Sequence, residues 1–342
     1  HEMTGAQLSN ILSYKLPDYM IPSHYIRLDQ MPLNQNGKLD VKTLPDPELQ
    51  STEDYRMPTT EEELLLAEVW SQVLGIDKIG VTDSFFLLGG DSIKCIQVIG
   101  RVRNAGFRLT VQDIFTDQTI DKLALKLKKI ETESDQSMVQ GTAKLSPIQQ
   151  LFWERETPDK HHYNQSVLLR FSKGISEQFA KKIFQKIQLH HDVLRSVFIT
   201  GDHEIKQDIR GAEMPVSLEF FDLKDENDPE AFLSAKLDQI QSGIDLRQGP
   251  LMKLGLFQRE NESLLAIVIH HLVVDGVSWR ILLEDIETLY RQLQDGKQLS
   301  LASKTDSILS WSEQLARYVK SEQFEIGRSY WSEQKKRTIP SI

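Results

Sequence analysis

The chain has 342 residues, of which 39% are hydrophobic and 26% are charged, and its formal net charge is −10. This composition is typical of a folded globular protein, and the length predicts about two domains. The acidic balance argues against a nucleic-acid-binding protein or a polybasic membrane-surface segment, and no apolar run reaches the ~18 residues of a membrane span. The chain opens at His1 with no secretory signal and has a single cysteine, Cys95. We therefore expect a piece of a longer cytoplasmic protein without disulfides, nucleic acid or membrane partners.

Residues 1–50 are rich in turn signals and hold too little apolar material to fold well alone. The turn signals are two X-Pro steps and one Asn-Gly dipeptide: Leu16-Pro17, Ile21-Pro22 and Asn36-Gly37. The alternation over residues 25–28 predicts a short strand with one buried face. Residues 51–59 are predicted to be a linker.

Residues 60–130 predict a small all-helical bundle. The first helix begins at a capping box formed by Thr60 and Glu63 and ends near Gly75. A second helical period follows Ser92 and closes at Gly106. Two shorter helical patterns lie near 111–115 and over 120–129, the latter with Thr119 as its candidate cap.

Ser92 follows a Gly-Gly turn at the start of the second of these helices. Glycines let the backbone turn tightly and leave the hydroxyl uncovered, and a helix N-terminus stabilises a phosphodiester through its dipole and free N–H groups. From these residues alone, the plainer interpretation is that Asp91 or Ser92 simply caps the helix. No Gly-x-Ser-x-Gly nucleophile elbow is present.

Residues 83–93 (Asp-Ser-Phe-Phe-Leu-Leu-Gly-Gly-Asp-Ser-Ile) resemble the core motif of the peptidyl carrier proteins of nonribosomal peptide synthetases, and the likeness extends over about 58–130. The resemblance implies that Ser92, preceded by Asp91, carries 4′-phosphopantetheine that a phosphopantetheinyl transferase attaches from coenzyme A. An aminoacyl or peptidyl group would ride on this arm as a thioester. Ser92 would then be an attachment point rather than a nucleophile in turnover.

The N-terminal segment resembles the C-terminal subdomain of a synthetase adenylation domain. The resemblance rests on 16–22, on Met31-Pro32-Leu33 and on the Asn-Gly-Lys-Leu-Asp run at 36–40. In that family the lysine of this run reaches the acyl-adenylate, and Lys38 occupies its position, where an ammonium can stabilise developing negative charge. An isolated Asn-Gly-Lys favours a solvated lysine, but its place just ahead of a carrier favours the family role. The large nucleotide-binding part is not in these 342 residues, so we expect no adenylation by this chain alone.

Residues 131–143 are polar and aperiodic, which predicts an interdomain linker, and from residue 144 the pattern becomes mixed α/β. The expected elements are a strand, a helix, a two-stranded hairpin and a second amphipathic helix. They cover, in order, 166–171, 177–190, 251–257 with 264–270, and 279–293.

Six of the nine histidines form adjacent pairs: His161-His162, His190-His191 and His270-His271. Zinc sites use spaced ligands together with cysteines or acids, so we predict no metal site. The pair His161-His162 is expected on the surface or in packing. The third pair follows an apolar strand and precedes a helix, which is where a positioned side chain can meet a substrate. A histidine suits proton transfer there, although a pair satisfied within the core is the plainer alternative.

The run from His270 to Gly276 resembles the His-His-x-x-x-Asp-Gly motif that condensation and epimerization domains of the chloramphenicol-acetyltransferase-like superfamily share. The resemblance implies that His271 is catalytic beside His270, and that Asp275 and Gly276 shape the loop. Asp275 would pair with an arginine, for which Arg195 is the candidate. The runs 145–150 and 245–251 fit the same family.

Two sequence features resemble those of epimerization domains and their carriers rather than those of condensation domains. Carriers that feed epimerization domains typically read Gly-Gly-Asp-Ser, as here with Asp91, and residues 272–280 look more like the epimerization version. The implied chemistry is reversible proton removal at Cα of a carrier-bound aminoacyl or peptidyl thioester. A condensation domain that forms peptide bonds, or a non-catalytic carrier and docking piece, remains an alternative.

The predicted architecture is thus multidomain. Residues 1–50 form a small α+β piece of an adenylation domain, 58–130 a four-helix-bundle carrier, and 144–342 the α/β N-terminal lobe of an epimerization or condensation-like domain. The expected partners are the rest of the synthetase, including the second lobe, and a downstream module. Inversion needs acid–base groups on two faces, and the family's second candidate is a glutamate of the second lobe. We therefore expect no epimerization by these 342 residues alone.

Overall fold

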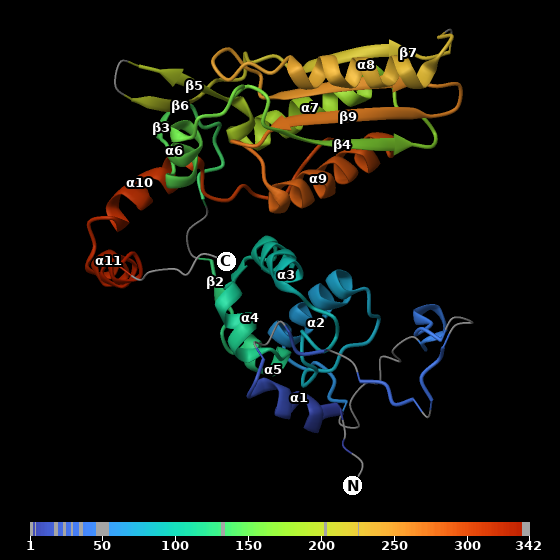
Figure 1. The fold of residues 1–342 in the computed structure, drawn as a ribbon, viewed down its shortest axis with the longest axis vertical. Coiled ribbons are helices and arrows are strands. Elements are labelled where there is room, and N and C mark those ends of the chain that lie inside the picture. Colours follow the sequence, from blue (N-terminus) through green and yellow to red (C-terminus); the bar gives the residue numbers. More distant parts are fainter. Residues whose placement is uncertain are drawn as a thin grey trace. The chain divides into compact units, whose positions relative to one another are not determined.

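The computed structural model describes residues 3, 5–16, 20–22, 25–28, 30–33, 37–45, 55–130, 134–201, 204–224 and 226–336. It divides into two compact units, His1–Thr132 and Glu133–Ile342 (Figure 1). The sequence predicts three domains, and the boundaries between them at 1–50, 58–130 and 144–342 stay predictions. Each unit is described by itself.

The N-terminal part of the first unit contains helix α1 (Gly5–Ser13) and the short 3-10 helix η2 (Val41–Thr43). The strand expected over 25–28 is wrong, because these residues pair with no neighbouring strand, and a run of four residues has little stability without one. The predicted turn at Asn36-Gly37 falls partly outside the described residues. Its Gly37 has a left-handed φ of 73°, and an isolated bridge joins Leu33 to Leu39 around it.

Residues 55–130 of the first unit, the expected carrier region, are built from four helices around one apolar core. Their bounds are α2 Glu61–Leu74, α3 Ser92–Asn104, α4 Val111–Asp117 and α5 Ile120–Ala124. The predicted capping box is confirmed, since the Thr60 hydroxyl accepts from the Glu63 N–H at 3.1 Å and the Glu63 carboxylate accepts from the Thr60 N–H at 3.2 Å. Gly75 ends α2 in the left-handed conformation, as expected. Trp70 and Phe85, both fully buried, meet at the centre of the core.

The expectation of an all-helical bundle needs one correction. The helix predicted over 120–129 ends at Ala124, and the chain then forms strand β2 (Lys128–Lys129), which pairs antiparallel with β1 (Phe107–Arg108). Gly106, with a φ of 84°, turns the backbone from α3 into β1 and so creates an edge for Lys128–Lys129 to pair with. Thr119 precedes α5, but its hydroxyl donates to the Asp121 carboxylate instead of capping the helix.

The second unit holds two sheets and six α-helices among its described residues. The small sheet has the order β3-β6-β5, and the large sheet has the order β4-β9-β8-β7 with only the β7–β8 pair parallel. The strands are β3 Gly141–Lys144, β4 Asn164–Phe171, β5 Ser196–Thr200, β6 Ile205–Ile209, β7 Ser217–Asp222, β8 Met252–Gln258 and β9 Ser263–His270. The helices are α6 Pro147–Glu154, α7 Glu177–His190, α8 Pro229–Ser242, α9 Gly276–Gln294, α10 Ile308–Tyr318 and α11 Glu322–Gln334, with a 3-10 turn η3 at Asp192–Arg195.

The large sheet is covered on both faces, because all eight residues of β9 are buried. Strands buried on both faces read as continuous apolar runs, as β9 does. Helix α8 packs on β8 and β9, and α7 packs on α9. The predicted strand at 166–171, helix at 177–190 and hairpin at 251–270 are confirmed. Helix α9 begins three residues before the predicted start, because the Asp275 carboxylate accepts from the Ser278 N–H and caps it there.

The predicted linker at 131–143 is only partly a linker. Residues 131–133 lie outside the described residues, but from residue 134 the chain belongs to the second unit. Gln136 exchanges hydrogen bonds with the backbone of Lys304, the Val139 carbonyl accepts from Arg195, and β3 begins at Gly141. Among the helices described, none is both long and apolar enough to cross a membrane.

Candidate functional site

Ser92 is the first residue of α3 and its side chain is exposed. The preceding turn requires its glycines: Gly89 has a φ of 86°, and a Cβ on Gly90 would lie 2.4 Å from the Phe85 ring and 2.5 Å from the Phe85 carbonyl oxygen. The Asp91 carboxylate accepts from the N–H groups of Ile93 and Lys94, both at 2.8 Å. Asp91 is therefore the cap, and Ser92 is not used for that purpose.

The surroundings of Ser92 fit a phosphodiester. The hydroxyl lies at the N-terminal end of a 13-residue helix, where the helix dipole favours an anion. The Lys94 ammonium is held at this end by the Gly89 carbonyl, at 2.8 Å. A phosphate ester on the Ser92 oxygen would project into solvent, close to a cation and away from the core.

Lys38 is exposed in the turn between Leu33 and Leu39. The structure gives it no role in the surroundings of Ser92. Asn36 of the same run lies outside the described residues, so the role of Lys38 rests on the Asn-Gly-Lys run and its place ahead of the carrier.

His271 lies just after β9, where the chain leaves the sheet, and its side chain is partly exposed. Its backbone N–H donates to the Tyr163 carbonyl at 2.8 Å, and its ring stacks on the Tyr163 ring at 5.1 Å with an interplanar angle of 17°. Its Nδ1 lies 2.8 Å from the Val274 carbonyl oxygen, and its Nε2 lies 3.1 Å from the Gln165 amide nitrogen. Both ring nitrogens are thus oriented by named partners.

His270 is the neighbouring histidine, and it is fully buried. Its Nε2 donates to the Lys160 carbonyl at 2.9 Å, and its Nδ1 accepts from the Leu272 N–H at 3.2 Å. Burial lowers the pKa of His270 to about 4, so it is neutral at pH 7. With both nitrogens occupied, His270 supports the loop and is not available to a substrate.

Asp275 and Gly276 begin α9. The Asp275 carboxylate accepts from the N–H and the hydroxyl of Ser278, at 2.8 and 2.7 Å. Desolvation opposes ionisation of Asp275, but these bonds hold the pKa of its carboxyl below the usual value. The expected pairing of Asp275 with Arg195 is wrong, because the Asp275 carboxylate is used as the N-cap of α9 and Arg195 lies in a different network.

Arg195 is fully buried and pairs with the Asp192 carboxylate at 2.7 Å. Lys304 pairs with the same carboxylate at 3.2 Å. The other hydrogen bonds of the Arg195 guanidinium go to the carbonyls of Val139, Gln188, Leu189 and Arg210. Arg195 therefore joins the residues before β3, the end of α7 and the end of β6, and its role is structural.

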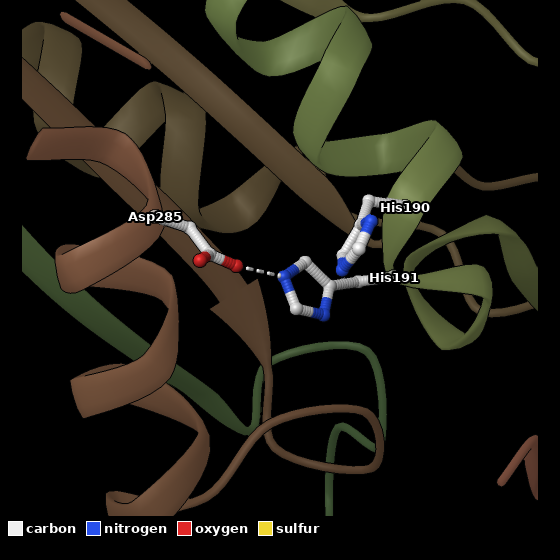
Figure 2. Close-up of side chains that lie close together, drawn as sticks. All are labelled: His190, His191 and Asp285. Atoms are coloured by element: carbon white, nitrogen blue, oxygen red, sulfur yellow. Dashed lines mark hydrogen bonds and ion pairs between the residues drawn. The ribbon is translucent and has the colours of Figure 1, made fainter. Parts of the chain in front are cut away.

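The pair His190-His191 lies with Asp285 of α9 in a cluster that resembles a metal site (Figure 2). The His191 Nε2 is 2.7 Å from the Asp285 oxygen, which is a hydrogen-bonded distance. Two ligands of one tetrahedral zinc ion would lie about 3.3 Å apart. Burial, followed by the charge of His191, lowers the pKa of His190 to about 4; the Asp285 charge acts against this shift, and the charges of Lys304 and Lys186 act with it. The hydrogen-bonded distance favours a His191–Asp285 bond between α7 and α9, and the absence of a metal site stays a prediction.

His161 also has a structural role. Its Nδ1 accepts from the Leu246 N–H at 3.0 Å and lies near the Asp245 carboxylate. His162 is exposed. The expectation that this pair serves packing or the surface agrees with these contacts.

Two residues of the His271 surroundings are not predicted from the sequence, namely Gln165 of β4 and Trp279 of α9. Gln165 shares the inward face of β4 with Val167, Leu169 and Phe171. A polar residue at an inward position of an apolar strand needs a hydrogen-bonding partner, and this is the signal that the sequence contains.

Comparison with known proteins agrees with this arrangement. The Condensation domain family matches residues 139–342, and the family named Phosphopantetheine attachment site matches 65–127. Tyrocidine synthase 2 of Brevibacillus parabrevis is 43% identical over 96% of this chain, and gramicidin S synthase 1 of Brevibacillus brevis is 41% identical over 95%. The chain covers only 9% and 30% of these two proteins.

Solved structures give the same result. The epimerization domain from the third module of tyrocidine synthetase B is 40% identical with a TM-score of 0.59, over 61% of this chain and 48% of that one. The starter condensation domain of the rhizomide synthetase shares the fold at 24% identity, with a TM-score of 0.52 over 58% of this chain and 48% of that one. The chain belongs to the condensation-domain family and, with its phosphopantetheine carrier domain, is a segment of a nonribosomal peptide synthetase.

Proposed function

We propose that Ser92 is the residue that carries 4′-phosphopantetheine. Its exposed hydroxyl on a helix N-terminus, after a turn that admits no Cβ at Gly90, supports this assignment. When bound, the group supplies a thiol that holds an acyl substrate as a thioester. The chain's own residues expose the serine: Asp91 takes over the capping bonds, and Lys94 places a cation at the turn.

Mass spectrometry of the intact chain tests this assignment. Incubation with coenzyme A and a phosphopantetheinyl transferase should add one phosphopantetheinyl mass to the wild-type chain and none to Ser92→Ala. The Ser84→Ala variant removes a nearby hydroxyl in the same region and should be modified normally. A mass gain that persists in Ser92→Ala would refute the assignment.

We further propose that the second unit belongs to an epimerization domain in which His271 moves the Cα proton. The observation that carries this is the position of His271 at the end of a buried strand, with Nδ1 bonded to the Val274 carbonyl and Nε2 facing the Gln165 amide nitrogen. The 40% identity to an epimerization domain and the presence of Asp91 before Ser92 add support.

The chemistry follows from the thioester. Removing the Cα proton leaves the electron pair of the C–H bond on Cα, from which it delocalises onto the carbonyl oxygen. The Nε2 of His271 receives the proton and can return it, while the Val274 carbonyl stabilises the charged ring through the Nδ1–H. His270 keeps the loop in place and takes no part, because it is fully buried, whereas His271 is partly exposed.

Residues 1–50 are proposed to be the end of an adenylation domain, with Lys38 as its mobile lysine. The proposal rests on the Asn-Gly-Lys run and its place ahead of the carrier. The partners that follow are the remainder of the synthetase, a phosphopantetheinyl transferase and a downstream module.

The stereochemical outcome in the parent synthetase tests the role of His271. With wild-type protein, the carrier-bound residue or the peptide should contain the D isomer after chiral analysis. His271→Ala should leave only the L isomer, whereas His162→Ala, which changes an exposed histidine, should behave as wild type. Loss of peptide-bond formation with unchanged stereochemistry in His271→Ala would instead indicate a condensation domain.

A further inference from the structure

Gln165 is the residue whose side chain meets the Nε2 of His271, and it does not act alone. Its amide nitrogen is 3.1 Å from that Nε2, and its amide oxygen is 2.9 Å from the Trp279 indole nitrogen. The three residues come from β4, from the end of β9 and from the first turn of α9. They form one continuous chain of hydrogen bonds that ends at the Val274 carbonyl.

The direction of every bond in this chain follows from Trp279. An indole N–H can only donate, so the Gln165 atom that faces it must be the carbonyl oxygen. The amide –NH₂ of Gln165 therefore faces His271 and can only donate. At the other end of the ring, the Val274 carbonyl can only accept, so the Nδ1 of His271 must carry a proton.

Only one protonation state of His271 satisfies both neighbours. In the imidazolium, an Nε2–H would oppose the Gln165 –NH₂. In the neutral ring with the proton on Nε2, the Nδ1 lone pair would also oppose the Val274 oxygen. The neutral ring with the proton on Nδ1 leaves no conflict.

The geometry points to Gln165, held by Trp279, as a positioning residue that keeps His271 neutral, with its proton on Nδ1 and the lone pair on Nε2. This rests on the proposed function, because it explains how His271 would be ready to accept a Cα proton. The Gln165 –NH₂ gives up its bond to the Nε2 lone pair, the proton passes from Cα to Nε2, and the C–H electron pair stays on the substrate. The imidazolium that results faces the Gln165 –NH₂ and returns the proton readily, as a reversible exchange requires.

The remaining groups around His271 do not fix its tautomer. The ring of Tyr163 stacks on the imidazole, Asp275 lies four residues along the loop with its carboxylate on Ser278, and His270 is neutral with both nitrogens used. The two ring nitrogens of His271 are bonded by Gln165 and by the Val274 carbonyl, so these two groups decide where its proton lies.

Nitrogen-15 NMR of the 342-residue chain, labelled in histidine, tests this directly, since protonated and unprotonated ring nitrogens have well-separated shifts. The His271 signals are assigned by their loss in His271→Ala. We expect an unprotonated Nε2 and a protonated Nδ1 in the wild type at neutral pH. Gln165→Glu, which is isosteric, places a carboxylate opposite Nε2 and should protonate it, raising the titration midpoint of His271 by about one pH unit.

Two further variants separate positioning from general effects. Gln185→Glu makes the same charge change at an exposed position of α7 and should leave the His271 signals unchanged. Trp279→Phe keeps an aromatic ring but frees the Gln165 amide to turn its oxygen towards Nε2, so a ring protonated on both nitrogens should become more populated. In the parent synthetase, Gln165→Glu should lower Cα exchange at pH 7 by up to tenfold, and exchange should recover at higher pH.

The proposal is overturned if His271 carries its proton on Nε2 in the wild type, or if Gln165→Glu leaves its tautomer and midpoint unchanged. Because the NMR readout needs no substrate, it holds or fails independently of whether the synthetase epimerizes.

Discussion

The turn before Ser92 makes a sharp prediction about two glycines of the same segment. Gly90→Ala would place a methyl carbon 2.4 Å from the Phe85 ring and 2.5 Å from the Phe85 carbonyl oxygen. Neither neighbour can move freely, because Phe85 is fully buried against Trp70 and its carbonyl accepts from the Gly90 N–H at 2.9 Å. Overpacking of this kind costs typically 1–3 kcal/mol, and with both neighbours fixed we expect about 3 kcal/mol.

Gly100→Ala is the matched control. Gly100 lies within α3, and nothing is within 4 Å of the position its Cβ would take. The same methyl group should therefore stabilise the helix, by up to about 1 kcal/mol, because glycine is a poor helix former.

Hydrogen exchange measured by mass spectrometry on peptides from α2 and α3 gives the assay, because it reports on the carrier region separately from the second unit. Gly90→Ala should raise the opening equilibrium of these peptides about a hundredfold, and Gly100→Ala should lower it. Modification of Ser92 by a phosphopantetheinyl transferase should slow in Gly90→Ala alone. Wild-type exchange in Gly90→Ala would refute the argument that the turn admits no Cβ.

Three other predictions concern buried ionisable groups. Burial raises the pKa of the Cys95 thiol to about 11, so iodoacetamide at pH 8 should alkylate Cys95 only after unfolding. Fast alkylation of the folded protein would contradict the burial of Cys95. Burial lowers the pKa values of His190 and His270 to about 4, so the unfolded state binds more protons than the folded state below pH 6.5. The second unit should therefore lose stability as the pH falls from about 6.5 towards 4. Hydrogen exchange of α7 and β9 peptides measures this loss, and His190→Gln should weaken the pH dependence. Arg195→Met should destabilise the second unit by about 3 kcal/mol in the same assay. This is the low end for a broken buried ion pair, because Lys304 still neutralises Asp192. A change below 1 kcal/mol would refute the structural role of Arg195.

The local elements were predictable because each depends on residues close in the sequence. The capping box at Thr60 and Glu63 needs only four residues. The hairpin of β8 and β9 needs two apolar runs and a polar turn. The exposed serine after Gly90 follows from a short motif, and the resemblance to carrier proteins extends over the helices around it.

Two of the errors concern partners that the sequence pattern does not reveal. Strand β2 forms only because Gly106 turns the chain so that β1 offers it an edge. The family resemblance pairs Arg195 with Asp275, although Asp192, one helical turn before Arg195, takes its charge in the structure. The resemblance therefore identifies the arginine but not its partner.

The polar surroundings of His271 escape prediction for a related reason. Gln165 and Trp279 are 114 residues apart, and each alone reads as an ordinary strand or helix residue. Their importance arises from the pairing of β4 with β9, which sets Gln165 opposite Ile269, one residue before the histidine pair. The pattern of β4 does contain a signal, a glutamine on its apolar face.

Deuterium incorporation at Cα tests the central claim most directly. The parent synthetase, loaded at Ser92 with an L-aminoacyl or peptidyl thioester, is incubated in D₂O without any acceptor, and the released residue is analysed for deuterium and chirality. Our account predicts deuterium at Cα and a mixture of D and L isomers, both lost in His271→Ala and retained in His162→Ala. An L residue free of deuterium from the wild type, or exchange that persists in His271→Ala, would contradict it.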